Sequence, residues 1–254
     1  MPVVSIVMPA YNAAPYIEAA ITSVLKQAYT DWELLVVNDC STDDTAAIVR
    51  RLAADDARII LMENDRNRGV SYTRNYAIAQ AKGEWIAFLD SDDLWREGKL
   101  EKQMACVSQH PDGVLFYTAS SFITGDGQPL HYVMPAEEVM TYPMLLRRNL
   151  LSCSSVLVRK DVIAQVQMGH DKMHEDYSAW LTILKKYPCA YGVNEPLLIY
   201  RFTPNSKSGN RIKSAGMLYR SYRYVGYHTL TAAYYTCRYT LHSVSKRYKI
   251  AITK

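Results

Sequence analysis

The sequence predicts an α/β fold with a mostly parallel sheet covered by helices on both faces, for three reasons. Four apolar runs recur in the first ninety residues: "VVSIVM" from Val3, "WELLVV" from Trp32, "RIILM" from Arg58 and "EWIAFL" from Glu84. Near-continuous apolar runs are typical of strands buried on both faces. The segments between them have helical periodicity, and an alternation of roughly 25 to 30 residues implies right-handed crossovers between parallel strands.

The connecting helices have recognisable starts. The first is expected over about 15–27, because Pro15 suits the first helical position. The second is expected to begin with Ser41 or Thr42 as its N-cap. The third is expected over about 70–81.

After Trp95 the pattern loosens. A helix is expected from about Glu97 to Ser108, and another in "HEDYSAWLTILKKY" from His174. Further strands are expected in "VLFYTASSFIT", "PLHYV", "SSVLVRKD" and "PLLIYR". The stretch "TPNSKSGN" from Thr203 has the composition of a mobile loop.

Composition excludes several classes of protein. Hydrophobic residues at 49% and charged residues at 21% are a usual globular mix, so the chain is not expected to be disordered. The five scattered cysteines form no CxxC pair, which argues against a disulfide framework or a thiolate zinc site. The start "MPVVSIVMPAYN" reads as a strand rather than a signal peptide, and no run is long enough to span a bilayer. We therefore expect a cytoplasmic protein.

The net charge of +4 hides an asymmetry. From Pro196 to Lys254 the chain has eleven Lys or Arg and no acidic residue, which leaves 18 basic and 25 acidic residues, a net charge of −7, in the first 195. An acidic body therefore carries a basic C-terminal segment.

Polar residues gather where three of the expected strands end. The first strand ends at "PAYN" from Pro9, the second at Asn38-Asp39 and the fourth at "DSDD" from Asp90. Ligands of open α/β sheets bind beyond the carboxyl ends of the strands. We therefore expect these clusters to border one binding site.

Three aspartates lie within four positions in "FLDSDDLW". Like charges repel at this spacing, and a carboxylate resists leaving water, so Asp90, Asp92 and Asp93 destabilise the fold unless a cation or a set of donors meets them. Two carboxylates separated by one small residue can hold Mg²⁺ or Mn²⁺. The alternative is that Asp92 or Asp93 caps the helix that follows.

Three ordered segments resemble a known family. "VSIVMPAYNAAPYIEAAITSVLKQ", "WELLVVNDCSTDDT" and "NRGVSYTRNYAIAQAKGEWIAFLDSDDLW" are similar, in order and spacing, to family 2 glycosyltransferases with the GT-A fold. The resemblance is close over about 3–110 and looser as far as Arg201. It implies a catalytic domain at 1–203, with a nucleotide-binding half at about 1–110 and an acceptor half at about 111–203. The remaining residues, 204–254, are then a mobile loop followed by basic amphipathic helices.

The resemblance also implies a nucleotide site. Pro9, Ala10 and Tyr11 would border the base, with Tyr11 available for stacking. Asp39 would accept a hydrogen bond from the base, most often uracil, and Arg74 would lie near the nucleotide. The alternatives are a packed aromatic ring at Tyr11, a turn residue at Asp39 and a solvated helix charge at Arg74.

The DxD motif of the family falls on "DSD". The resemblance implies that Asp90, Ser91 and Asp92 contact the ribose and diphosphate, and that Asp90 and Asp92 hold the divalent metal, Mn²⁺ or Mg²⁺.

The acceptor half carries the expected base. Inverting transfer needs a group that takes the proton of the acceptor hydroxyl. The family places an E-D pair before a helix in its second half, which points to Asp176 as base and Glu175 as the second choice. The alternative is that both are first-turn acids favoured by the helix dipole. Trp180 could pack against the acceptor sugar or belong to the core.

His170 and His174 have the i, i+4 spacing of a helical metal pair. No HExxH glutamate accompanies them, so we expect neither to bind metal.

The basic segment has two open interpretations. Over 211–249 a continuous helix would have an apolar face, formed by Tyr219, Tyr222, Gly226, Leu230, Ala233, Cys237, Leu241 and Val244. Eight tyrosines between Tyr219 and Tyr248 suit an interface between apolar and aqueous surroundings. Such a helix can lie on an anionic membrane surface or pack on the catalytic domain.

The function expected from these features is that of an inverting glycosyltransferase, a hexosyltransferase in class. It would move one sugar from a nucleotide diphosphate donor, best matched by a UDP-sugar, to a saccharide acceptor that is lipid-linked in bacterial polysaccharide synthesis. It would act in the cytoplasm or at the inner face of the plasma membrane.

Two other functions stay open from the sequence. A sugar nucleotidyltransferase also combines an α/β fold with carboxylates and a metal, but "PAYNAAPY" lacks the glycine and lysine of its nucleotide loop. A nucleic-acid-binding protein could use the basic, tyrosine-rich segment. That reading leaves the carboxylate cluster unexplained, and no nucleic acid is expected as partner.

Overall fold

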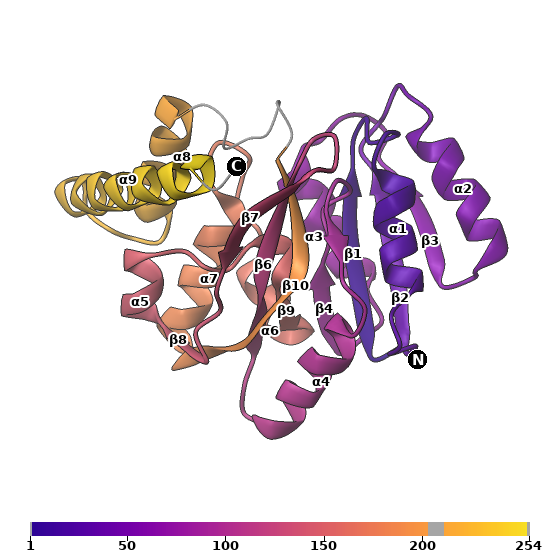
Figure 1. The fold of residues 1–254 in the computed structure, drawn as a ribbon, viewed down its shortest axis with the longest axis horizontal. Coiled ribbons are helices and arrows are strands. Elements are labelled where there is room, and N and C mark those ends of the chain that lie inside the picture. Colours follow the sequence, from indigo (N-terminus) through magenta and orange to yellow (C-terminus); the bar gives the residue numbers. More distant parts are fainter. Residues whose placement is uncertain (1, 203–210, 253–254) are drawn as a thin grey trace.

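The computed structural model of the protein describes residues 2–202 and 211–252, with side chains for 2–202 and 212–240. The loop predicted at 203–210 lies outside the described residues. One ten-stranded sheet forms the centre of the molecule (Figure 1), in the order β3-β2-β1-β4-β9-β6-β10-β5, with β7 paired to β6 and β8 paired to β10. The strands are β1 Val4–Ala10, β2 Trp32–Asn38, β3 Ile59–Glu63, β4 Trp85–Phe88, β5 Leu94–Trp95, β6 Leu115–Thr124, β7 Pro129–Met134, β8 Val139–Thr141, β9 Leu157–Arg159 and β10 Cys189–Phe202.

The two halves of the sheet run in the same direction and are separated by one antiparallel strand, β9. β3, β2, β1 and β4 pair in parallel, as the apolar runs predict. β6 and β10 are also parallel, whereas β9 pairs antiparallel with both β4 and β6. β9 therefore joins the two halves into one sheet. The boundary expected near residue 110 falls between a helix that ends at Gln109 and a strand that begins at Leu115. Because strands from both sides of this boundary belong to one sheet, the division into two halves stays a prediction.

Helices cover both faces of the sheet, which confirms the predicted fold class. Ile6 packs into the core of one face and Val7 into the core of the other, because neighbouring strand residues point to opposite sides. The helices are α1 Ile17–Leu25, α2 Thr45–Asp55, α3 Val70–Gln80, α4 Lys99–Gln109, α5 Tyr142–Arg147, α6 Lys160–Val166, α7 Glu175–Lys186, α8 Arg211–Tyr224 and α9 Thr229–Ile252, with a 3-10 turn at Cys153–Ser155.

The N-cap predicted for the second helix is wrong. α2 begins at Thr45, and the Asp43 carboxylate accepts the hydrogen bond of the Thr45 backbone amide at 3.0 Å. Ser41 and Thr42 instead contact Asn12. The Asn12 backbone amide donates to Ser41 Oγ at 3.0 Å, and the Thr42 backbone amide donates to Asn12 Oδ1 at 2.8 Å. These bonds join the loop after β2 to the loop after β1, which places both loops at one edge of the sheet.

The basic segment forms two helices rather than one. α8 ends at Tyr224 and α9 begins at Thr229, with Gly226 between them at a φ of 101°. The face predicted for a continuous helix is confirmed at Tyr222, which is fully buried, but wrong at Leu230, Ala233 and Cys237, which are exposed. The break changes the rotation of α9 relative to α8, so the two helices bury different stripes. Leu241 and Val244 lie outside the described side chains.

The helix pair packs beside α5 and α7 at one side of the sheet (Figure 1). Within the described residues, no helix combines the length and apolar character needed to cross a membrane.

Candidate active site

The carboxyl ends of β1 and β2 lie side by side. Ala10 pairs with Asn38 in the parallel register, and the Asp39 amide donates to the Ala10 carbonyl at 2.8 Å. Pro9, Ala10 and Asp39 are therefore neighbours, as expected from the strand ends. Ala10 is fully buried, whereas the ring of Tyr11 is 52% exposed and free to meet a ligand.

Asp39 organises the loop that leads into α3. One carboxylate oxygen accepts hydrogen bonds from Asn64 Nδ2 at 2.7 Å and the Arg68 amide at 2.8 Å. The other accepts from the Gly69 amide at 2.8 Å. Each carboxylate oxygen can accept two hydrogen bonds. Asp39, which is 4% exposed, thus anchors the loop, and its Oδ2 accepts one hydrogen bond from the described residues where it could accept two.

The three aspartates after β4 have different surroundings. Asp93 is 1% exposed and accepts hydrogen bonds from Ser154 Oγ at 2.6 Å and the Arg201 amide at 2.9 Å. Asp90 accepts from Arg74 at 2.5 Å. No other residue of the described part of the chain donates a hydrogen bond to the Asp92 carboxylate. Asp93 therefore fastens the turn to β10, and Asp92 is left as an open ligand.

Crowding shifts the pKa values of this turn. Burial raises the pKa of Asp92 to about 6, and the nearby Asp90 charge adds to the effect. Burial, together with Asp92 and Asp90, raises the pKa of Asp93 well above its usual range. Hard divalent cations prefer carboxylate oxygens. The open Asp92 carboxylate beside Asp90 thus fits such an ion, although no group of three ligating side chains gathers anywhere in the described part of the chain.

Arg74 connects the aspartate turn with the acceptor half. Its guanidinium, 4% exposed, donates to Asp90 at 2.5 Å and to Glu175 at 2.7 Å. The buried Nε of Arg74 has no partner among the described residues. The solvated-charge alternative for Arg74 is therefore wrong. Asp90 and Glu175 are thus held by the two terminal nitrogens, Nη2 and Nη1, of one guanidinium group.

Glu175 and Asp176 begin α7, but they are not equivalent. Glu175 is 5% exposed and occupied by Arg74. Asp176 is partly exposed, and one of its oxygens accepts the Tyr177 amide at 2.7 Å. Burial raises the pKa of Asp176, and the Glu175 charge raises it further. Asp176 therefore has the more accessible carboxylate, and its pKa lies above the usual value for an aspartate.

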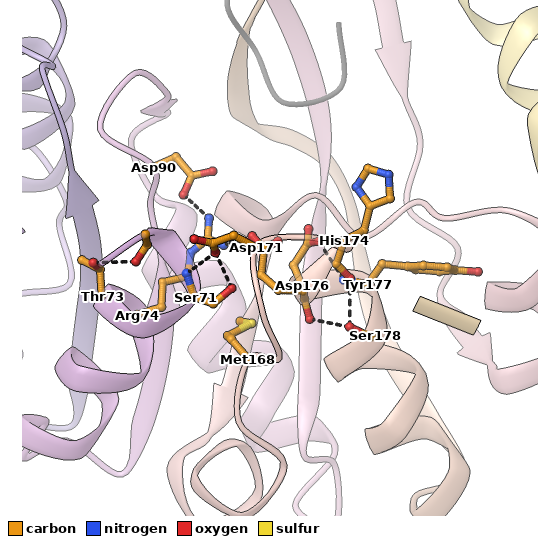
Figure 2. Close-up of polar contacts among 12 residues, drawn as sticks. Ser71, Thr73, Arg74, Asp90, Met168, Asp171, His174, Asp176, Tyr177 and Ser178 are labelled. Carbon is orange, nitrogen blue, oxygen red and sulfur yellow. Dashed lines mark hydrogen bonds and ion pairs between the residues drawn. The ribbon is translucent and has the colours of Figure 1, made fainter. Parts of the chain in front are cut away.

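Helix α3 holds the loop that precedes this pair (Figure 2). The Asp171 carboxylate accepts hydrogen bonds from the Ser71 amide at 2.9 Å and the Ser71 hydroxyl at 2.6 Å. One turn further, the Asn75 side chain bonds both the carbonyl and the amide of Met168, each at 2.8 Å. Together with Arg74, these contacts fix the segment 168–175 to α3.

Sequence reasoning missed several of these residues. Asp93 was recognised only as part of the cluster, and Ser154, Asp171 and Arg201 were not singled out. The Arg201 side chain also donates to the Asp92 carbonyl at 2.9 Å. Their partners lie 61 to 109 residues away along the chain, so no local spacing marks them.

Other candidates have plainer roles. Trp180 is fully buried, with its ring 5.7 Å from that of Phe88, so it belongs to the core and does not contact an acceptor. His170 lies in the loop and His174 is the N-cap residue of α7, so the two do not share a helix. Ser91 is partly buried in the aspartate turn.

Comparison with known proteins identifies the family. Residues 5–163 match the family model described as "Glycosyl transferase family 2". A Bacillus subtilis protein that carries the provisional name of a teichuronic acid biosynthesis glycosyltransferase, TuaG, is 37% identical over 97% of this chain and 98% of its own. The chain belongs to glycosyltransferase family 2. This glycosyltransferase is also 36% identical to WfgD of Escherichia coli, named a UDP-Glc:α-D-GlcNAc-diphosphoundecaprenol β-1,3-glucosyltransferase, over 83% of this chain and 81% of that one.

Solved structures confirm the GT-A fold of the glycosyltransferase. S. aureus TarS in complex with UDP-GlcNAc superposes with a TM-score of 0.73 at 18% identity, over 94% of this chain and 71% of that one. A mannosyltransferase of Pyrobaculum calidifontis, in complex with GDP-Man and Mn²⁺, has a TM-score of 0.71 at 20% identity, over 96% of this chain and 75% of that one. The family finding favours a hexosyltransferase over a sugar nucleotidyltransferase or a nucleic-acid-binding protein.

Proposed function

We propose that this glycosyltransferase transfers one sugar, with inversion, from a UDP-sugar to a saccharide carried on a lipid diphosphate during cell-surface polysaccharide synthesis. The observation that carries the proposal is the Arg74 bridge, because it holds the donor-side Asp90 next to the acceptor-side Glu175 and Asp176. The name of WfgD, a UDP-Glc-dependent glucosyltransferase with a diphosphoundecaprenol-linked acceptor, supports the UDP-sugar donor and the lipid-linked acceptor.

The base would bind between Tyr11 and Asp39. The exposed ring of Tyr11 offers a stacking face, and Pro9 and Ala10 form the strand end beneath it. Uracil has one imide N–H, which matches the one position left on Asp39 Oδ2.

Asp90 and Asp92 would hold the divalent metal, Mn²⁺ or Mg²⁺, with Ser91 between them beside the ribose and diphosphate. When bound, the ion neutralises charge on the diphosphate. The open carboxylate of Asp92 supports this assignment. Arg74 orients Asp90 through a charge-assisted hydrogen bond.

Asp176 would act as the base, because Glu175 is occupied by Arg74. The acceptor oxygen forms a bond to the anomeric carbon, and the bond from that carbon to the diphosphate oxygen breaks, with its electron pair leaving on UDP. The acceptor hydroxyl proton goes to the Asp176 carboxylate. Attack opposite the leaving group inverts the anomeric carbon.

The test is transfer from UDP-glucose to α-D-GlcNAc-diphosphate bearing an undecyl chain, with Mn²⁺ and with EDTA. We expect metal-dependent release of UDP and a product of β configuration by NMR. Asp92→Asn and Asp176→Asn should each lower kcat by about 100-fold or more, while Asp112→Asn, at an exposed carboxylate, should not. Retention of configuration would contradict the inverting mechanism. Calorimetric titration with UDP, GDP and dTDP would identify the base independently of the acceptor.

We further propose that α8 and α9 touch an anionic membrane surface at the inner face of the plasma membrane. Ile212 is 88% exposed and Leu230 is 84% exposed, and the exposed Arg220 and Arg223 accompany them. Apolar side chains beside arginines suit the headgroup region of a bilayer that contains anionic lipids.

Vesicle co-sedimentation tests this contact. We expect binding to vesicles of phosphatidylglycerol and phosphatidylcholine, and none to phosphatidylcholine alone. The double variant Arg220→Glu/Arg223→Glu should lose binding. Lys26→Glu/Lys82→Glu, with the same change in charge at exposed lysines elsewhere, should keep it. Equal loss in both variants would contradict a specific surface on α8.

A further inference from the structure

Helix α8 lies along the loop that leads to the E-D pair. At one end of the loop, the rings of Tyr224 and His170 meet edge to face with centroids 6.4 Å apart. In the middle, Arg220 donates to the Lys172 carbonyl at 2.9 Å. The contacts become densest at His174, the last residue before Glu175.

A single hydroxyl of α8 bonds the backbone of His174 on both sides. The His174 amide donates to Ser221 Oγ at 3.1 Å, and Ser221 Oγ lies 3.2 Å from the His174 carbonyl, to which it can donate. The same hydroxyl lies 3.2 Å from the Met217 carbonyl of its own helix, so its one proton is shared between two acceptors. Ser221 is fully buried, and water cannot replace these bonds.

The imidazole of His174 is held by the same face of α8. Its Nε2 lies 3.2 Å from Ser214 Oγ and 3.3 Å from the Ser214 carbonyl. Ser214 and Ser221 are seven residues apart, which is two helical turns, so they lie on one side of α8. Both the backbone and the side chain of His174 therefore depend on this helix.

His174 is the N-cap residue of α7, so its backbone sets where the helix and its first carboxylates begin. Glu175 is fixed from the other side by Arg74 of α3. Asp176 has no comparable anchor of its own, since the one described hydrogen bond to its carboxylate comes from the next residue. The direction of its carboxylate therefore follows from how the turn 174–176 is clamped between α3 and α8.

We propose that Ser221 and His174 are positioning residues for glycosyl transfer: α8 holds the N-cap of α7 and thereby places the Asp176 carboxylate against the acceptor hydroxyl. This inference rests on the proposed role of Asp176 as base. It makes the basic C-terminal helices part of the active-site scaffold rather than an attachment to it.

The first experiment compares Ser221→Ala with Thr236→Val in the full-length protein. Thr236, on α9, also donates its hydroxyl to a carbonyl of its own helix, at 2.7 Å. Thr236→Val therefore removes the same kind of bond that Ser221 makes to Met217, without removing a bond to His174. With UDP-glucose and α-D-GlcNAc-diphosphate bearing an undecyl chain, Ser221→Ala should lower kcat by about 10- to 100-fold. KM for UDP-glucose and the affinity for UDP should stay within about twofold of the unsubstituted protein. Ser221→Thr, which keeps the hydroxyl, should recover most of kcat.

Ser214→Ala gives a second, milder test, since it removes a contact to the imidazole from a partly buried position. It should lower kcat less than Ser221→Ala and again leave the donor parameters unchanged. The proposal is overturned if Ser221→Ala lowers kcat no more than Thr236→Val, or if donor KM rises in step with the loss of kcat.

Amide hydrogen exchange separates this proposal from the proposed function. In Ser221→Ala, the amides of 174–178 should exchange at least about tenfold faster, while those of α3 should not change. Unchanged exchange at 174–178 overturns the proposal whatever the activity. If no sugar is transferred by the unsubstituted protein but exchange responds as expected, the function assigned to the site is wrong and the clamp by α8 stands.

Discussion

The Asp171 carboxylate lies so close to Gly69 that a β-carbon built on Gly69 would stand 1.6 Å from Asp171 Oδ2. The same carboxylate caps the start of α3 through Ser71, 100 residues away in the sequence. Gly69 also has a φ of 82°, where only glycine is unstrained. The close approach of the two residues thus joins the start of α3 to the loop before α7.

We therefore expect Gly69→Ala to lower the free energy of unfolding by more than backbone strain alone. Gly127 is the control, because its φ is 89° and the nearest atom to an added β-carbon is 3.8 Å away. Gly127→Ala should cost about 1–3 kcal/mol, and Gly69→Ala should cost more. In the double variant Gly69→Ala/Asp171→Ala, the cost should be less than the sum of the single costs by about 0.5–3 kcal/mol, as measured by urea unfolding. Additive costs would show that Asp171 does not limit space at Gly69.

Arg74 offers a second stability prediction. Arg74→Met would leave two carboxylates, Asp90 and Glu175, without their buried cation, and should lower the free energy of unfolding by about 3–5 kcal/mol. Arg68→Met is the control: Arg68 pairs with Asp65 near the surface, so its loss should cost about 1 kcal/mol or less. Equal effects of the two substitutions would mean that the buried bridge contributes nothing beyond an exposed ion pair.

Asp92 should destabilise the metal-free protein at neutral pH. Its pKa is about 6 in the folded chain and about 3.9 in an unfolded one. Because the folded chain holds the Asp92 proton more tightly, protonated Asp92 favours folding. This contribution to the free energy of unfolding is fully present below the unfolded pKa and is lost as pH rises through the folded pKa. In EDTA, Asp92→Asn should therefore be more stable than the unsubstituted protein by about 1–3 kcal/mol at pH 8, and the gain should vanish near pH 4.

Manganese should reverse this order. Binding to the folded state stabilises the unsubstituted protein, whereas Asp92→Asn should gain less. Thermal unfolding with EDTA and with Mn²⁺ measures both effects, and Asp112→Asn serves as the exposed-carboxylate control. If Mn²⁺ raised Tm equally in Asp92→Asn, the ion would bind elsewhere.

The pH dependence of transfer should report Asp176. Because burial and the Glu175 charge raise the pKa of Asp176, the base form is lost at a higher pH than for an ordinary carboxylate. With saturating Mn²⁺, which keeps Asp92 ionised, kcat should fall as pH decreases through that raised pKa. Asp176→Asn should remove this acid limb together with most of the activity. An acid limb near pH 4 would argue against Asp176 as the base.

The parallel strands of the first ninety residues can be predicted from the sequence, for a physical reason. Strand ends and the polar residues that follow them are local features, so Asp39, Asp90 and Asp92 could be located beyond the sheet from their positions alone. The spaced carboxylates by themselves indicate a divalent metal, whereas the base and the nucleotide contacts come from the family resemblance. The assignment of these roles to single residues stays a prediction.

The remaining features depend on contacts between distant segments. Ser41 and Thr42 have the residue types and positions of N-caps. The local sequence does not show that Asn12, in another loop, binds them instead. Gly226 can occur inside a helix or end one, so periodicity alone could not locate the break between α8 and α9. The choice between Glu175 and Asp176 required the position of Arg74, which lies 101 residues from Glu175.

The dependence of His174 on Ser221 has a consequence for synthesis of the chain. The ribosome releases residues 1–202, with every strand of the sheet, before it releases α8. If the proposed site is right, a nascent chain can assemble its nucleotide contacts while the turn 174–176 still lacks half of its clamp. Transfer would then be slow until the basic helices have emerged and folded, so an unfinished chain would bind a nucleotide sugar and consume it slowly.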